Sequence, residues 1–188
     1  MGTIIIHPHE LTLGLAGAWH AVATDESRPI LTGVHFDQPG DAVLRLTAAD
    51  NYRIACHDVP TLPGTEIVLG EGITLRRSDI RLLRRIVATV SGLLDISVTA
   101  GGRLRVEWSG GVVEFTPMGR TYPDPSALFN EPLAEPSVTV DPRYLRDAGA
   151  GAFAAGASRL AVEIRGPLDP IILRAGPYTE IIMPIRTK

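Results

Sequence analysis

The chain has 188 residues, of which 45% are hydrophobic and only 5% are aromatic, so it predicts a folded aliphatic core and excludes a wholly disordered chain. Its formal charge of −3 argues against a protein covered in basic groups but leaves room for a local basic surface. No apolar run reaches the length of a membrane span and no signal-peptide pattern opens the chain, so we expect a soluble, cytoplasmic protein. The single cysteine, Cys56, excludes an internal disulfide and a cysteine-based zinc site, and its apolar surroundings predict a buried thiol.

Three stretches share a short strand, a polar break and an aliphatic residue that opens a helical pattern. The last strand aliphatic and the first helix aliphatic are equally spaced each time: Ile6 to Leu11, Leu75 to Ile80 and Val140 to Leu145. Asp141 and Pro142 suit the N-cap and the first turn of the third helix. The constant spacing predicts an internal repeat.

Three strand-like segments separated by Gly- and Pro-containing turns follow each predicted helix. They span 33–37, 42–48 and 52–59, then 94–99, 103–108 and 112–117, then 159–165, 170–174 and 178–185. The prediction is an α+β fold of three strand–helix–strand–strand–strand units. Two units, at about 1–62 and 63–120, form a complete domain over 1–120; a proline-rich connector covers 121–136, and 137–188 form half a domain.

The second predicted helix has a basic side that carries Arg77, Arg81, Arg84 and Arg85, and Arg76 lies just before it. The helix also has a broad apolar side, and no acidic residue lies at helical spacing among the arginines. This apolar side consists of Ile80, Leu82, Leu83, Ile86, Val87 and Val90. This pattern favours contact with phosphates over an ordinary solvated face, which usually mixes both signs. Arg143 and Arg146 add to the third helix, although Asp147 lies beside them, and the first helix offers only His20.

Four segments resemble the bacterial DNA polymerase III β subunit, the DNA sliding clamp family. Segments 27–36 and 44–55 are similar to its middle domain, 122–124 to its aromatic-Pro-Asp linker, and 178–186 to its C-terminal strand. The match is to a shortened form, with the middle domain and the second half of the last domain. Ala49-Asp50-Asn51 stands where the family shows Thr-Asp-Gly, and Asn51 could keep the geometry because Asn tolerates left-handed backbone.

The resemblance implies a processivity factor that is not an enzyme, encircles double-stranded DNA without reading its sequence and tethers the replicative polymerase. In this DNA-clamp fold the helices line a ring and the sheets lie outside, so Arg76, Arg77, Arg81, Arg84, Arg85, Arg143 and Arg146 are the expected DNA-binding residues. The family's ring contains twelve units, so three units per chain imply a tetramer in which the unpaired third unit pairs with its counterpart on another chain. A monomer or a dimer that never closes is the alternative.

The resemblance also implies an apolar groove that takes short peptides from the polymerase and other proteins with a clamp-binding motif; a clamp loader is a further candidate partner. The groove residues carried over are Leu31, Ala49, Asn51, Tyr52, Arg53, Ile54, Ile181, Met183, Pro184, Ile185 and Arg186. For each aliphatic member the competing interpretation is a plain core residue, and that interpretation is strongest for Ile54.

No catalytic, metal or cofactor site is predicted. His7 and His9 lie at a strand-to-helix break, where polar residues serve as caps, and Asp50, His57 and Asp58 have no accompanying nucleophile. A second hypothesis is a clamp-like interaction module, a decoy or regulator that does not encircle DNA. The missing halves favour that module, whereas the basic helix favours the clamp.

Overall fold

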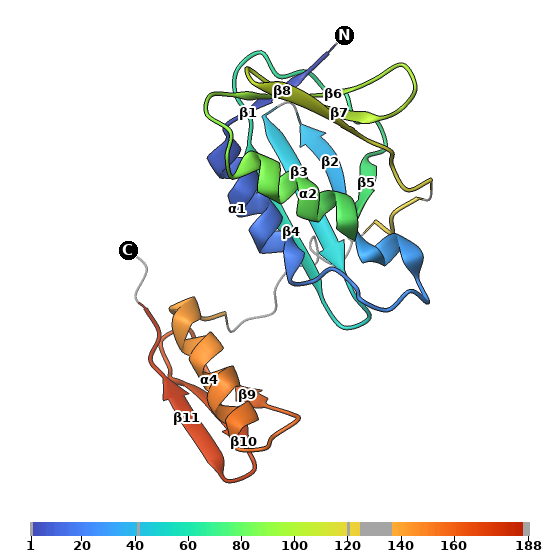
Figure 1. Ribbon diagram of the computed structural model, residues 1–188. Helices are drawn as coiled ribbons and strands as arrows, with labels where there is room; N and C mark the ends of the chain where they lie inside the picture. Colours follow the sequence, from blue (N-terminus) through green and yellow to red (C-terminus); the bar gives the residue numbers. More distant parts are fainter. Residues whose placement is uncertain (1, 41, 120, 125–136, 186–188) are drawn as a thin grey trace. The chain divides into compact units, whose positions relative to one another are not determined.

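The computed structural model describes residues 2–40, 42–119, 121–124 and 137–185 (Figure 1). The chain forms two compact units, Met1–Pro125 and Ser126–Lys188. No helix among the described residues is long and apolar enough to cross a membrane.

The N-terminal unit contains the same series of elements twice. The first series is β1 (Ile4–Ile6), α1 (Pro8–Trp19), a 3-10 turn η1 (Pro29–Thr32), β2 (Gly33–Gly40), β3 (Val43–Ala49) and β4 (Ile54–Pro60). The second is β5 (Ile73–Arg76), α2 (Arg77–Val87), β6 (Leu94–Val98), β7 (Leu104–Trp108) and β8 (Gly111–Phe115). The predicted strand–helix–strand–strand–strand repeat is therefore present in both halves of this unit.

The two repeats exchange their first strands. β1 leaves its own series and pairs with β6, which gives a sheet of order β1–β6–β7–β8. β5 pairs in turn with β2, which gives the sheet β4–β3–β2–β5 (Figure 1). Both exchanges are antiparallel and set Ile6 opposite Leu94 and Leu75 opposite Val34. Each repeat thus completes the sheet of the other.

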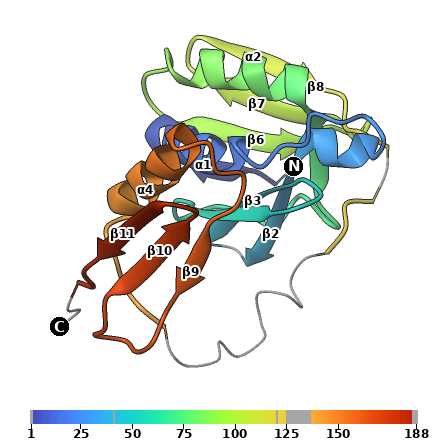
Figure 2. The ribbon, with the colours of Figure 1, turned by 90° about the horizontal axis from the view of Figure 1, so that it is seen from below.

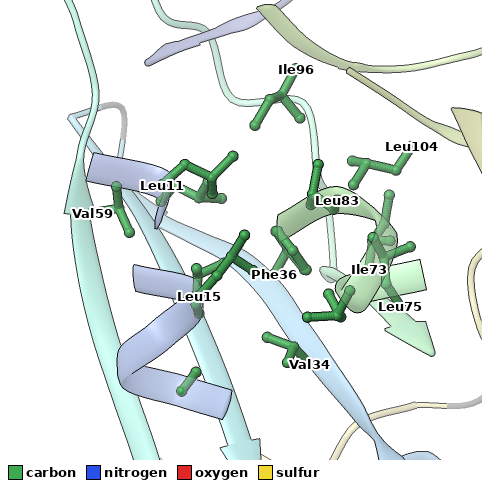
Figure 3. Close-up of a cluster of buried hydrophobic side chains, with 14 of the residues drawn as sticks. Leu11, Leu15, Val34, Phe36, Val59, Ile73, Leu75, Leu83, Ile96 and Leu104 are labelled. Atoms are coloured by element: carbon green, nitrogen blue, oxygen red, sulfur yellow. The ribbon is translucent and has the colours of Figure 1, made fainter. Parts of the chain in front are cut away.

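One hydrophobic core fills the space between these sheets and the two helices. Leu11 and Leu15 from α1, Phe36 from β2, Leu83 from α2 and Ile96 from β6 are fully buried within it (Figure 3). The residue at position 14 has to be glycine for α1 to lie this close to the sheet, because a Cβ there would overlap side chains of β3 and β4. The helices are therefore packed directly on the exchanged sheets.

The C-terminal unit contains α4 (Pro142–Ala154), β9 (Ala161–Glu163), β10 (Ile171–Ala175) and β11 (Tyr178–Ile182). The strands form a sheet of order β11–β10–β9, and Figure 2 shows α4 along one face of it. Ala148, Ile171, Leu173 and Ile182 make a small buried cluster. The Asp141 side chain accepts a hydrogen bond from the Arg143 amide at 2.9 Å, so the predicted N-cap is confirmed.

One backbone hydrogen bond recurs in all three repeats. In each, an amide just beyond the last strand donates to the central carbonyl of the first segment at 2.8 Å: Leu62 to Ile5, Met118 to Thr74 and Ile185 to Thr139. Ile5, Thr74 and Thr139 are the residues that the sequence repeat aligns. The bond therefore places Val138–Val140 where β1 and β5 lie in the first two repeats.

Val138–Val140 nevertheless is not a strand, contrary to the sequence prediction. β1 and β5 become strands because each joins the sheet of the other repeat, and among the described residues of the C-terminal unit no second repeat offers such a sheet. The first two helices begin before the aliphatic residue that opens each predicted pattern: α1 begins at Pro8, before Leu11, and α2 begins at Arg77, before Ile80.

Cys56 is exposed, which corrects the prediction of a buried thiol. Successive residues of β4 face opposite sides of the sheet. Val59 faces the core beneath α1, so Cys56 lies on the outer face, with Sγ 3.3 Å from the Thr47 hydroxyl. The sequence of this strand therefore did not show which of its side chains face the core and which face the solvent.

His35 on β2 is a half-buried titratable group at the junction of the two repeats. Its ring stacks on Tyr122 with centroids 4.9 Å apart, and Nδ1 lies 3.0 Å from the Thr74 hydroxyl of β5. Burial lowers the pKa of His35 to about 4, because the imidazolium loses its hydration.

We expect this histidine to make the N-terminal unit less stable in acid. Between the ordinary pKa near 6.5 and the folded value of about 4, the unfolded chain binds a proton that the folded chain does not, so stability falls as pH falls through that window. The loss from pH 7 to pH 4.5 should be about 2 kcal/mol in the free energy of unfolding. Urea unfolding at both pH values measures it, and His35→Phe, which keeps an aromatic ring against Tyr122, should remove most of this pH dependence. An unchanged dependence in that variant would contradict the assignment.

Candidate nucleic-acid interface and partner groove

α2 presents a basic side away from the core. Ile80, Leu83 and Val87 are buried, whereas Arg81 and Arg85 are exposed. Arg77 and Arg84 are half-buried, and Arg76 lies exposed at the end of β5. The predicted division of this helix into an apolar and a basic side is thus present in the structure.

Trp19, the last residue of α1, lies beneath three of these arginines. The guanidinium carbons of Arg77, Arg84 and Arg81 are 4.9, 5.1 and 5.7 Å from the centroid of its ring. An indole face attracts cations at such distances. The tryptophan therefore holds three like charges close together on one surface, which would otherwise repel one another.

None of the five predicted arginines in 76–85 forms an ion pair with a carboxylate among the described residues. Arg76 and Arg77 each donate to a backbone carbonyl, of Thr116 and Ala23, at 3.4 Å. Arginines on the sheets behave differently, since Arg45 pairs with Asp58 at 2.6 Å and Arg105 with Glu107 at 2.9 Å. The charge of α2 is therefore available to an external anion.

The surface beside α2 is hollowed. A cavity of about 610 Å³ is lined by Arg76, Arg77 and Arg81, with Glu26 as the acidic member of its lining. The side chains of Ser78 and Thr32 add hydroxyl groups to the same lining. Three guanidinium groups that line a concave surface can hold phosphate oxygens without contacting a base.

The arginines of α4, in contrast to those of α2, form ion pairs with aspartates. Arg143 binds Asp141 at 2.6 Å and Arg146 binds Asp147 at 2.8 Å. The Arg143 guanidinium also lowers the pKa of the Asp141 carboxyl to about 2. Local carboxylates thus compensate both charges, and α4 presents a weaker basic surface than α2.

Sequence reasoning missed Trp19. It assigned α1 only His20 as a potential contact, because it considered each helix separately. The sequence did indicate it in one way: Trp19 lies two helical turns beyond Leu11, on the same side of the first predicted helix. Its role depends on α1 packing against α2, which is a tertiary contact between repeats.

The N-terminal members of the predicted groove divide into core and exposed residues. Leu31 and Ala49 are buried and pack with Ala23 and Tyr122, while Ile54 packs partly against that cluster. Asn51, Tyr52 and Arg53 are exposed in the turn between β3 and β4, and Tyr52 is 95% exposed. An aromatic side chain open to solvent beside a small apolar cluster is a reasonable contact for a peptide.

The β3–β4 turn does not use left-handed backbone at Asn51, since no described residue other than glycine has a positive φ. The Asp50 carboxylate closes the turn instead. It accepts hydrogen bonds from the amides of Tyr52 at 2.8 Å and Arg53 at 3.1 Å, and from the Arg53 Nε at 2.9 Å. The expectation for Asn51 was therefore wrong, and Asp50 explains why the glycine is dispensable.

The C-terminal members lie at the end of β11 and just beyond it. Ile181, Met183 and Ile185 are 59%, 64% and 49% exposed, while Ile182 between them is buried. Pro184 is half-buried, and Arg186 lies outside the described residues. Three large apolar side chains are therefore exposed at the end of the C-terminal unit's last strand and just beyond it.

The chain shares sequence with two curated sliding clamps, although no protein-family model matches it. It is 35% identical over 79 residues to the beta sliding clamp of Halalkalibacterium halodurans, a match that covers 42% of this chain and 20% of the relative. It is 35% identical over 88 residues to that of Synechocystis sp., covering 42% of this chain and 22% of the relative. The matched part is about a fifth of the length of these relatives.

The structural similarity extends further than the sequence similarity. A Caulobacter crescentus beta sliding clamp superposes with a TM-score of 0.78 at 19% identity, over 98% of this chain and 50% of that one. The beta subunit of Streptococcus pyogenes DNA polymerase gives 0.75 at 20% identity, over 99% and 51%. The chain is similar to the bacterial DNA polymerase III β sliding clamps, in fold over nearly its whole length and in sequence over 42% of it. It spans about half the length of the sliding clamps whose structures it matches.

Proposed function

We propose that the chain is a sliding clamp that encircles duplex DNA and tethers a DNA polymerase, without catalysing a reaction. The observation that carries the proposal is the basic side of α2, where Arg81, Arg84 and Arg85 have no ion pair among the described residues of a clamp fold. A cytoplasmic location, where bacterial DNA is replicated, accompanies this function.

The electrostatics suit a protein that slides. Phosphate contacts bind DNA without selecting a sequence, and their strength depends on salt. A chain with a formal charge of −3 and one basic helix attracts DNA to that helix while the rest of its surface does not. Weak binding is sufficient because a closed ring retains DNA by topology.

A ring of four chains follows from the number of repeats. The clamp ring implied by the resemblance contains twelve units, and this chain supplies three. The half domain of the C-terminal unit then requires a partner from another chain. We therefore propose a homotetramer, which a clamp loader opens if the ring is stable when closed.

Reversing the charge of Arg81 and Arg85 should abolish most DNA binding. Both side chains are exposed, so Arg81→Glu/Arg85→Glu should fold normally and lower the affinity for duplex DNA at low salt by at least about tenfold. The slope of log affinity against log salt should become shallower by roughly two, because two phosphates would no longer be neutralised. Fluorescence anisotropy with a labelled duplex across a salt series measures both quantities.

The matched control is Arg28→Glu/Arg103→Glu, which changes the formal charge equally at two exposed positions outside α2. It should lower the affinity only slightly and leave the salt slope nearly unchanged. Equal losses of affinity in the two variants would show a general charge effect and contradict a binding surface on α2.

Light scattering coupled to size exclusion should give the mass of four chains, about 80 kDa, since one chain is 20.1 kDa. The measurement needs a concentration series, because an interface between subunits responds to dilution. A mass of one or two chains throughout the series would contradict the tetrameric ring.

For peptide binding we propose two sets of side chains, each lying within one compact unit and each a contact surface by itself. The C-terminal set consists of Ile181, Met183 and Ile185, whose exposed apolar groups suit a peptide's aliphatic anchors. Tyr52 and Arg53 of the N-terminal set add an aromatic face and a donor for the peptide's polar groups.

Met183→Glu should weaken binding of a clamp-binding peptide from a bacterial replicative polymerase by about tenfold or more, because it places a charge against an apolar anchor. Leu168→Glu is the control, since Leu168 is 61% exposed and Met183 64% exposed in the same unit. Isothermal titration calorimetry of both variants compares the affinities. Unchanged binding by the Met183 variant would exclude this part of the groove.

A further inference from the structure

β9 of the C-terminal unit corresponds to β6 of the N-terminal unit. The hairpins β7–β8 and β10–β11 close with the same two-residue turn, since Trp108 pairs with Gly111 and Ala175 with Tyr178. Counting along the paired strands then aligns Val106 with Leu173. Their neighbours across the sheet, Ile96 and Val162, are therefore equivalent, and so are Leu94 and Leu160.

Equivalent side chains differ sharply in burial. Ile96 is fully buried, whereas Val162 is 54% exposed on the core side of its sheet, next to the buried Leu173. The helices show the same difference, because Leu11 and Ile80 are fully buried and Leu145 is 43% exposed. The C-terminal unit therefore leaves open an apolar surface that the same fold covers in the N-terminal unit.

In the N-terminal unit the other repeat buries the equivalent apolar surface. β1 lies on the edge of β6, and α1 packs against α2. In the C-terminal unit no described strand pairs with the free edge of β9. Val138–Val140 also has one edge without a backbone partner. On one side the Thr139 carbonyl accepts a hydrogen bond from the Ile185 amide, and on the other side no backbone hydrogen bond is found within the described part of the chain.

We propose that two copies of this chain pair through their C-terminal units by exchanging these segments. Val138–Val140 of each copy becomes a strand on the β9 edge of the other copy. The unit carries both a donor segment and an acceptor edge, so the contact is self-complementary and closes with twofold symmetry. A segment of Val, Thr and Val brings no charge to the edge, so nothing in it opposes the pairing.

The N-terminal unit provides the register. Ile6, Ile5 and Ile4 lie opposite Leu94, Asp95 and Ile96. By the equivalences above, Val140, Thr139 and Val138 should lie opposite Leu160, Ala161 and Val162 of the partner subunit. This contact would cover Val162 and bring the α4 helices of the two copies together, as α1 and α2 are in the N-terminal unit.

The inference specifies one interface of the proposed ring, but its test uses neither DNA nor a polymerase. In a Cys56→Ser background, one differently tagged chain carries Val138→Cys and the other carries Val162→Cys, and the two are co-expressed. Mild oxidation should give a covalent heterodimer on a non-reducing gel, and neither variant expressed alone should cross-link. Pairing Val138→Cys with Ala161→Cys is the control, because Ala161 faces the other side of the sheet.

A second measurement tests the surface itself. Val162→Lys should reduce the mass in solution by at least half, whereas Leu168→Lys should leave it unchanged, although the two side chains are 54% and 61% exposed. Circular dichroism checks that both variants are folded. A parent chain that is monomeric throughout, a cross-link as efficient at Ala161 as at Val162, or equal effects of the two lysines would overturn the proposal. Loss of DNA binding with the cross-link intact would contradict only the clamp function.

Discussion

The exchange of first strands between two repeats is the interaction on which the rest of this structure depends. β1 completes the sheet of the second repeat and β5 that of the first, so neither repeat has a finished sheet by itself. The exchange joins both sheets and both helices around one core. It also brings the end of α1 against α2, where Trp19 meets the arginines. The core and the candidate DNA surface therefore both result from the strand exchange.

The C-terminal unit follows the same rule with one repeat instead of two. The hydrogen bond from Ile185 to Thr139 is made as in the other repeats, because both of its residues belong to one repeat. Among the described residues of this unit no second repeat covers Val162 and Leu145, and both side chains are exposed. The proposed pairing would link folding to association, because a second copy would remove from water the apolar area that one chain leaves exposed.

The arginines of the sheets and of α4 differ from those of α2 in whether a carboxylate compensates their charge. On the sheets, Arg45 and Arg105 have carboxylate partners across or along the strands, and on α4 each arginine has a nearby aspartate. On α2 the stabilising contact is an aromatic ring, which holds guanidinium groups without neutralising them. A chain with a formal charge of −3 thereby keeps one helix whose arginines form no ion pair with a carboxylate of the described residues.

The sequence by itself determined the repeat, the two faces of α2 and the cap of α4, because equal spacing, helical periodicity and an Asp-Pro pair are local patterns. Only the tertiary structure decided where each first strand pairs, that Cys56 faces outward, that Asp50 closes the turn at Asn51, and that Trp19 lies under the arginines. The aliphatic segment Val138–Val140, which the sequence repeat aligns with β1 and β5, has no strand partner among the described residues of the C-terminal unit. The physical reason is that β pairing and aromatic contacts join residues distant in the chain, so a local pattern can indicate the capacity for a contact but not the partner that makes it.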